Sequence, residues 1–192
     1  PAQPTARATP AQRAAEPAAV TAVPVSLDVF AADEQSDHPV AVERWSELAR
    51  AVLEAEGVKH DTEVSLLFVD APTIASLNER FLGKSSPTDV LAFPIEDDLE
   101  RGGRSPDEGG TGPGSVEPDV DQLVLLGDVV VCPVVAAVNA VDHGVSFDDE
   151  IALLVVHGIL HLLGMDHQVE AEAERMEQRE QQLLARFYRV AS

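Results

Sequence analysis

Four short stretches of the chain are apolar throughout or alternate apolar with polar residues, and they are rich in β-branched side chains. Both patterns are typical of β-strands. We predict strands over residues 22–30, 63–70, 88–94 and 123–132. Pro24 in the first stretch favours a sheet edge or a strand start, because proline has no backbone N–H to donate.

Five other stretches repeat apolar residues every three or four positions, which is the spacing of one face of an α-helix. We predict helices over residues 39–57, 72–82, 133–144, 147–163 and 169–188. The helix over 147–163 is strongly apolar, so we expect it to be buried. The last helix surrounds a few apolar residues with Glu, Gln and Arg, which predicts a solvated helix with one packed side.

Two segments have no apolar period. Residues 1–22 consist mainly of Ala, Pro, Thr, Gln and Arg, and residues 97–121 are dense in Gly, Pro and acidic residues. Such segments bury too little apolar surface to offset their ordering entropy, so we expect a disordered tail and a mobile acidic insertion. The rest, residues 23–190, is expected to form one domain. Its order of elements predicts an α+β fold, with an approximately four-stranded mixed sheet packed with helices.

The most informative residues are three histidines near the end of the apolar helix. His157 and His161 are four positions apart, which places them on one face of a helix with Cβ atoms about 5–6 Å apart. Gly164 stands where the helix must end, and a left-handed turn there brings His167 towards the same point. Three imidazoles with an open fourth position suit Zn²⁺, so we predict one zinc ion per chain. Asp166 is the candidate to hydrogen-bond a ligand imidazole.

The motif has two other interpretations, as core histidines or as the metal site of a protease. As core residues, the three histidines would each need their own hydrogen-bond partners. One metal ion would instead satisfy a ring nitrogen of all three imidazoles at once. The spacing also equals that of the metzincin proteases, H-E-x-x-H-x-x-G-x-x-H. Gly158 stands where those enzymes have their general-base Glu. A metalloprotease-like hydrolase would therefore lack its base, although its metal site would remain.

The charge and the cysteine content limit the function further. The 192 residues include 13 Lys and Arg against 34 Asp and Glu, a net charge of −21. This charge argues against a protein that binds nucleic acid by bulk phosphate neutralisation, so a polyanionic substrate needs a local site. Cys132 is the single cysteine and cannot form an internal disulfide, which favours a reducing cytoplasm. The longest apolar run is too short for a membrane helix.

Four motifs together resemble the YbeY endoribonuclease family of bacterial rRNA maturation factors. They are HGILHLLGMDH at 157–167, PTDVLAFP at 87–94, LGDVVVC at 126–132 and the pair Leu77-Asn78. The resemblance spans roughly residues 23–185. It implies a zinc-dependent, single-strand-specific endoribonuclease of the cytoplasm that matures the 3′ end of the small-subunit rRNA and acts in ribosome quality control. The implied fold is α+β with a zincin-like metal helix.

The resemblance also assigns roles to residues and partners. It makes the three histidines zinc ligands and catalytic residues, single-stranded rRNA precursor the substrate, and the small ribosomal subunit or its assembly proteins the partners, with no membrane involved. Many members have an RNA-contacting Arg where this chain has Leu82. Arg80 and Lys84 are the candidates to replace it as RNA-binding residues.

The chemistry expected of such a site is metal-assisted cleavage of a phosphodiester. Zinc lowers the pKa of bound water from about 15.7 towards roughly 7 and can polarise a phosphoryl oxygen. Water and the RNA 2′-OH both stay open as the nucleophile. The alternative from another functional class is a non-catalytic ribosome assembly factor with a structural zinc, whose acidic surface would suit a basic ribosomal protein.

Overall fold

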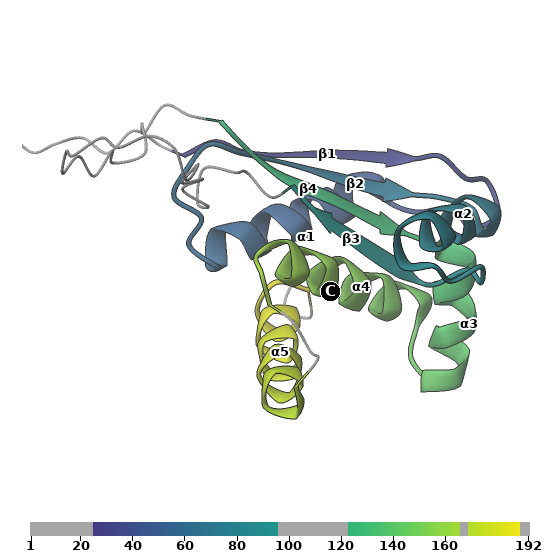
Figure 1. Ribbon diagram of the computed structural model, residues 1–192. Coiled ribbons are helices and arrows are strands. Elements are labelled where there is room, and N and C mark those ends of the chain that lie inside the picture. The colour runs from purple at the N-terminus through teal and green to yellow at the C-terminus, as the bar shows by residue number, and fades with distance from the viewer. Residues whose placement is uncertain (1–24, 96–122, 166–168, 189–192) are drawn as a thin grey trace, which may run out of the picture.

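The computed structural model describes residues 25–95, 123–165 and 169–188. These residues form one α+β domain with a four-stranded mixed sheet, as the sequence predicts (Figure 1). The predicted tail at 1–22 and the predicted insertion at 97–121 lie entirely outside the described residues. Their expected disorder and the domain boundaries therefore stay predictions.

The sheet consists of the strands β1 (Leu27–Asp33), β2 (Thr62–Phe68), β3 (Val90–Pro94) and β4 (Val124–Val131). Their order in the sheet is β1-β2-β4-β3, which leaves β1 and β3 at its two edges. Strands β1, β2 and β4 run parallel, and β3 is antiparallel to β4.

The first strand is displaced along the sequence from its predicted position. It continues past Phe30 because Ala31 and Ala32 pair in register with Leu66 and Leu67 of the neighbouring strand. Alanine carries little strand preference of its own, so the alternating pattern gives no sign of this extension. Pairing with β2 therefore decides where β1 ends. Its place at a sheet edge agrees with the prediction.

All five predicted helices are present. Their bounds are Val42–Ala55 for α1, Ala71–Leu82 for α2, Pro133–His143 for α3, Phe147–Leu162 for α4 and Glu170–Leu183 for α5. The last predicted helix, 169–188, is divided, because a π-helical turn at Leu184–Tyr188 follows α5. No helix in the described parts of the chain is long and apolar enough to cross a membrane.

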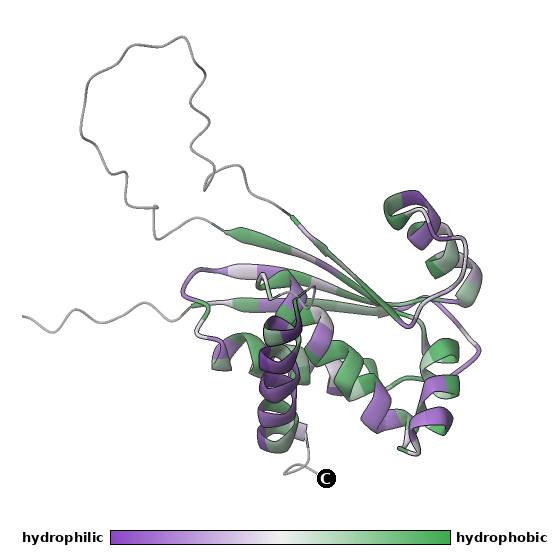
Figure 2. Ribbon diagram, turned by 60° about the horizontal axis from the view of Figure 1, so that its bottom comes forward, coloured by the Kyte–Doolittle hydropathy of each residue, from purple (hydrophilic) through white to green (hydrophobic). Residues whose placement is uncertain are grey.

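The main core lies between one face of the sheet and the helices α1, α4 and α5 (Figures 1 and 2). Helix α4 is its centre: it contacts β3, β4, α1, α3 and α5, and most of its residues are buried, as its apolar sequence predicts. Figure 2 shows α5 as largely hydrophilic, and its buried residues lie on one side. The histidine pair is therefore held on the most constrained helix of the domain.

A smaller cluster covers one end of the opposite face of the sheet. It joins Ile74 of α2 to Leu91 of β3, Val130 of β4 and the buried Cys132. Burial raises the pKa of the Cys132 thiol, which keeps it in its neutral form. This cluster holds α2 beside the edge strand β3, and these two elements form one wall of the site described next.

Candidate metal centre and substrate cleft

The ends of α4 set where its histidines lie. Ser146 begins the helix with a capping box, in which its side chain accepts a hydrogen bond from the backbone N–H of Asp149 at 3.0 Å. Gly164, with φ of +86°, follows the last turn in the left-handed conformation that glycine adopts without strain. Between these ends the helical repeat places His157 and His161 on one face, as predicted.

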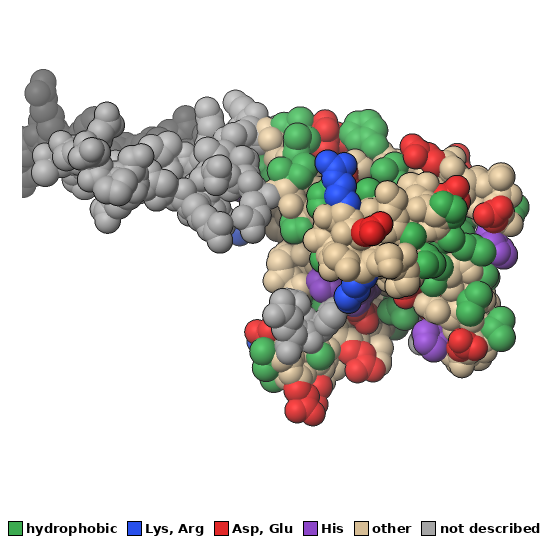
Figure 3. Space-filling view, turned by 45° about the vertical axis from the view of Figure 1, so that its right-hand side comes forward, with side chains coloured by type: hydrophobic (Ala, Val, Ile, Leu, Met, Phe, Trp, Pro, Cys, Tyr) green, Lys and Arg blue, Asp and Glu red, His purple; other side chains and the backbone are tan. Residues whose placement is uncertain are grey.

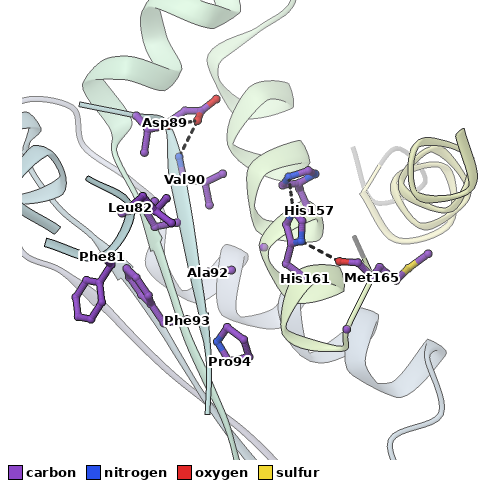
Figure 4. Close-up of a pocket in the computed structure, with 14 residues that line it drawn as sticks. Phe81, Leu82, Asp89, Val90, Ala92, Phe93, Pro94, His157, His161 and Met165 are labelled. Carbon is purple, nitrogen blue, oxygen red and sulfur yellow. Dashed lines mark hydrogen bonds between the residues drawn. The ribbon is translucent and has the colours of Figure 1, made fainter. Parts of the chain in front are cut away.

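The two imidazoles lie edge to face, with ring centroids 4.5 Å apart (Figure 4). Their Nε2 atoms are 3.0 Å apart. The Nδ1 atom of His161 donates a hydrogen bond to the backbone carbonyl of Met165 at 2.9 Å. The Nδ1 atom of His157 lies 2.7 Å from the Glu180 carboxylate. Each ring is therefore oriented through Nδ1, so that Nε2 of each faces the other.

Glu180 is a site residue that the sequence pattern did not reveal. It lies on α5, is 8% exposed, and is bonded to His157 across the helix interface. One signal was present in the sequence: Glu180 follows Met176 by four positions and precedes Leu184 by four, so it occupies the buried stripe of its helix. A carboxylate in such a stripe needs a partner, because unpaired burial of a charge is costly.

The donor set of the two histidines fits zinc. A carbonyl or carboxylate partner at Nδ1 fixes the tautomer in which Nε2 carries the lone pair that binds metal. A tetrahedral zinc ion, with bonds of about 2.0–2.1 Å, sets two ligand nitrogens about 3.3 Å apart. The distance of 3.0 Å between the Nε2 atoms is close to that value.

The rest of the predicted zinc site lies outside the residues that the structure describes. The third predicted ligand, His167, and the predicted hydrogen-bonding partner, Asp166, both belong to residues 166–168. Within the described residues, no group of three or more His, Cys, Asp or Glu side chains could hold a metal ion. The assignments of His167 and Asp166 therefore stay predictions, and the structure brings together two of the three histidines.

Gly158 has a packing role that explains its place in the motif. A Cβ atom built there would lie 2.5 Å from Cγ1 of Val129, which is fully buried in β4. Helix α4 therefore approaches the sheet so closely that only a hydrogen fits at this position. A Glu in place of Gly158, as in a metzincin, would require α4 to move away from β4.

A cleft of about 800 Å³ opens in front of the histidine pair. His157 and His161 line one side, and Phe81 and Leu82 at the end of α2 line the other. Between them runs β3, whose Val90 and Ala92 pack with the main core whereas Leu91 and Phe93 pack with the α2 cluster. The cleft therefore reaches around the free edge of β3 (Figure 4).

Asp89 holds the start of this edge strand in place. Its Oδ1 atom accepts hydrogen bonds from the hydroxyl of Thr88 at 3.0 Å and from the backbone of Val90 at 2.9 Å. Its Oδ2 atom accepts a third, at 3.0 Å, from the side chain of Asn139 in α3. The carboxylate thus ties β3 to α3 and fixes the floor of the cleft.

The two predicted RNA-binding residues lie near this cleft but do not line it. Arg80 is in the last turn of α2, with its guanidinium 5.2 Å from the centroid of the Phe81 ring. Lys84 follows the helix, and its backbone N–H bonds to the carbonyl of Asn78 at 3.3 Å. Neither is among the lining residues, whereas Leu82 is. Contact of Arg80 or Lys84 with RNA stays a prediction.

Comparison with known proteins finds consistent similarity to one family. The family model described as "Endoribonuclease YbeY" matches residues 30–188. The protein named Endoribonuclease YbeY from Beutenbergia cavernae is 43% identical over 154 residues, which cover 79% of this chain and 93% of that protein. The protein of the same name from Frankia casuarinae is 41% identical over 159 residues, covering 83% of this chain and 74% of that protein.

Similarity to a solved structure is weaker. The solution structure of TM1509 from Thermotoga maritima superimposes with a TM-score of 0.48 at 23% sequence identity, over 83% of this chain and 89% of that one.

Proposed function

The chain belongs to the YbeY endoribonuclease family, and we propose from that premise that it cleaves single-stranded RNA in the cleft between α2, β3 and α4, with one zinc ion held by His157, His161 and His167. The observation that carries the proposal is the pair of Nε2 atoms, 3.0 Å apart at the wall of that cleft. Each is oriented by a hydrogen bond at the opposite ring nitrogen.

The proposed substrate is the precursor of the small-subunit rRNA, cut during maturation of its 3′ end and in ribosome quality control. The four sequence motifs shared with the family and the name of the relatives support this assignment. The small ribosomal subunit or its assembly proteins are the proposed partners. We place the activity in the cytoplasm, because the only cysteine cannot form an internal disulfide.

The chain's own residues prepare the site for this reaction. Zinc, when bound, supplies Lewis-acid activation of water and of a phosphoryl oxygen. Glu180 and the carbonyl of Met165 hold the two rings in the tautomer that presents Nε2. Gly158 allows α4 to lie against β4, which sets both histidines beside the edge strand. The strand itself supplies a rigid floor along which an RNA chain can lie.

Two observations bear on the other candidate functions. The close contact of Gly158 with Val129 leaves no space for the general-base Glu of a metzincin, which disfavours a metalloprotease-like hydrolase. The net charge of −21 still suits a non-catalytic assembly factor that binds a basic ribosomal protein around a structural zinc. Turnover separates this last candidate from the proposed nuclease.

The decisive experiment measures zinc content and RNA cleavage side by side. The wild type should bind about one zinc ion and cut single-stranded RNA repeatedly, and His161→Ala should do neither. The matched control is His60→Ala, which removes a histidine far from the pair in the sequence and outside the cleft. It should retain both properties. Zinc binding by the wild type without any turnover would favour the assembly factor. A 2′,3′-cyclic phosphate on the product would identify the 2′-OH as the nucleophile.

A further inference from the structure

Three apolar side chains form a wall of the cleft away from the histidines. Phe81 and Leu82 are large and apolar, yet they are 54% and 57% exposed. The ring of Phe81 contacts that of Phe93 at a centroid distance of 4.8 Å, with the ring planes inclined by 53°. We call Phe81, Leu82 and Phe93 the aromatic wall. Exposed apolar surface inside a cleft often marks a place where a ligand binds.

The aromatic wall and the histidine pair lie on opposite sides of the same strand edge. Figure 4 shows Phe81 and Phe93 on one side of β3 and His157 and His161 on the other. All four residues line one cleft. A ligand that crosses the free edge of β3 would therefore touch both groups at once. A single nucleotide strand is long and thin enough to do so.

The charge of the cleft indicates what part of such a strand binds there. Among the described residues, the side chains lining the cleft include the carboxylate of Asp89 but no lysine or arginine. On the face of the molecule that Figure 3 shows, hydrophobic and acidic side chains outnumber the basic ones, and a basic side chain lies beside a histidine. Attraction to phosphates therefore has to come from the proposed zinc ion and from residues beside the cleft such as Arg80, whose guanidinium lies 5.2 Å from the centroid of the Phe81 ring, and the lining side chains away from the histidines offer an apolar surface instead. Bases bind aromatic side chains through their π-faces without needing positive charge.

The end of α2 is also held rigidly, which prepares Phe81 for binding. The buried side chain of Asn78 donates a hydrogen bond to the carbonyl of Ser86 at 2.8 Å, across the turn that follows the helix. Gly83 closes the helix in the left-handed conformation, with φ of +69°. A ring fixed before binding loses less conformational entropy when a base stacks on it.

We infer that the aromatic wall is a base-stacking subsite, in which Phe81 holds the base of a nucleotide next to the bond that is cut. This inference rests on the proposed function, because it takes the occupant of the cleft to be single-stranded RNA. It adds that, at the aromatic wall, the substrate is held by a base. Phe93 supports the Phe81 ring from behind, and Leu82 extends the apolar surface.

The test compares Phe81→Ala with a matched control, Phe30→Ala. Phe30 is 61% exposed, on the edge strand β1, at the other side of the sheet from β3. The probes are a short oligoadenylate RNA and an abasic ribose-phosphate oligomer of the same length and charge, with binding followed by fluorescence anisotropy. Stacking is worth about 1–3 kcal/mol per base, so Phe81→Ala should bind oligoadenylate roughly 5- to 150-fold more weakly.

The control variants and the abasic oligomer separate base stacking from contact with the phosphates. Phe30→Ala should bind like the wild type, and Phe81→Trp should bind at least as tightly as the wild type. The abasic oligomer should bind the wild type and Phe81→Ala equally, and the salt dependence of binding should not change. Equal loss of affinity for both oligomers, or no loss for either, overturns the inference. So does sedimentation that shows a wild-type dimer dissociated by Phe81→Ala, because a second copy would then cover the wall.

Failure of this inference can be separated from failure of the proposed function. A wild type that cuts RNA, together with a Phe81→Ala variant that binds oligoadenylate unchanged, overturns only the stacking subsite. A wild type that neither binds nor cuts RNA overturns the proposed function and the subsite with it.

Discussion

The Glu180 carboxylate, on α5, lies 2.7 Å from Nδ1 of His157, on α4. The candidate metal centre is therefore built from two helices, and the second one contributes a hydrogen-bond partner for His157, a proposed ligand. Loss of such a partner typically lowers metal affinity about 10–100-fold, because the ligand loses its fixed tautomer and orientation. We expect this loss in Glu180→Ala, and a smaller one in Glu180→Gln, which keeps an oxygen acceptor.

A competition assay with a chelator measures this change in zinc affinity. The matched control is Arg179→Ala, at the neighbouring position of α5. Arg179 makes a 2.6 Å ion pair with Glu56, which follows the last residue of α1. Removing this pair should leave zinc affinity unchanged. Equal losses in the Glu180 and Arg179 variants would mean that Glu180 acts only by docking α5.

The three histidines should be individually necessary for the metal. We expect about one zinc ion per chain, and nearly complete loss in His157→Ala, His161→Ala and His167→Ala, since two imidazoles hold zinc much more weakly than three. Elemental analysis of the purified variants measures the occupancy. Full occupancy in the His167→Ala protein would remove this residue from the ligand set while leaving the other two.

The close approach of α4 to β4 makes a prediction about stability. Gly158→Ala should destabilise the fold, because overpacking a core costs about 1–3 kcal/mol and a new Cβ would meet Cγ1 of Val129 at 2.5 Å. In a Val129→Ala background the same change should become stabilising, since the obstacle is gone and alanine favours a helix over glycine by about 1 kcal/mol. Denaturant unfolding of the wild type, Gly158→Ala, Val129→Ala and the double variant measures how strongly the two substitutions are coupled in unfolding free energy. Additive effects would contradict the packing role.

The pair of His143 and Glu150 predicts how stability depends on pH. Nδ1 of His143 lies 3.0 Å from the carboxylate of the buried Glu150, and this hydrogen bond, more than the charge of Glu150, raises the pKa of His143 above its ordinary 6.5. A raised pKa in the folded state means that folding favours the protonated imidazole. The stabilisation is therefore fully present below pH 6.5 and is lost as the pH rises through the raised pKa.

His143→Gln isolates this contribution. The difference in unfolding free energy between the wild type and His143→Gln should be largest in mildly acidic solution and should decrease as the pH rises. Urea unfolding across that range measures it, with His60→Ala as the control for a histidine that the structure does not pair with a carboxylate through its side chain. A difference that stays constant with pH would exclude the linkage.

Salt dependence tests whether Arg80 and Lys84 contact RNA. Each phosphate contact on a single strand contributes a slope of roughly −0.7 to the dependence of log affinity on log salt concentration. Arg80→Ala or Lys84→Ala should therefore weaken binding and flatten that slope by about this amount. Unchanged affinity and slope in both variants would mean that Arg80 and Lys84 do not contact RNA. Their charges would then only stabilise the C-terminal end of the α2 dipole, by about 0.3–1 kcal/mol.

The sequence predicts the elements of this fold better than their assembly. Periodicity reveals every strand and helix because each buries one face, but it does not show that β4 lies between β2 and β3, since pairing joins residues far apart in the chain. The helical spacing of His157 and His161 is local and therefore predictable. Glu180 was missed because its partner lies on another helix, and the contact of Gly158 with Val129 is likewise visible only once α4 is packed on the sheet.

The strands β3 and β4, which precede and follow residues 96–122 in the chain, are direct neighbours in the sheet. Pro94 pairs with Gly127, and the backbone N–H of Ile95 donates to the carbonyl of Leu126 at 3.1 Å. For a chain segment whose two ends are already close together, doubling the length costs only about 0.6 kcal/mol in closure entropy. This hairpin is thus a suitable place to graft a foreign sequence, such as an affinity tag or a fluorescent reporter, without displacing the edge strand that borders the cleft.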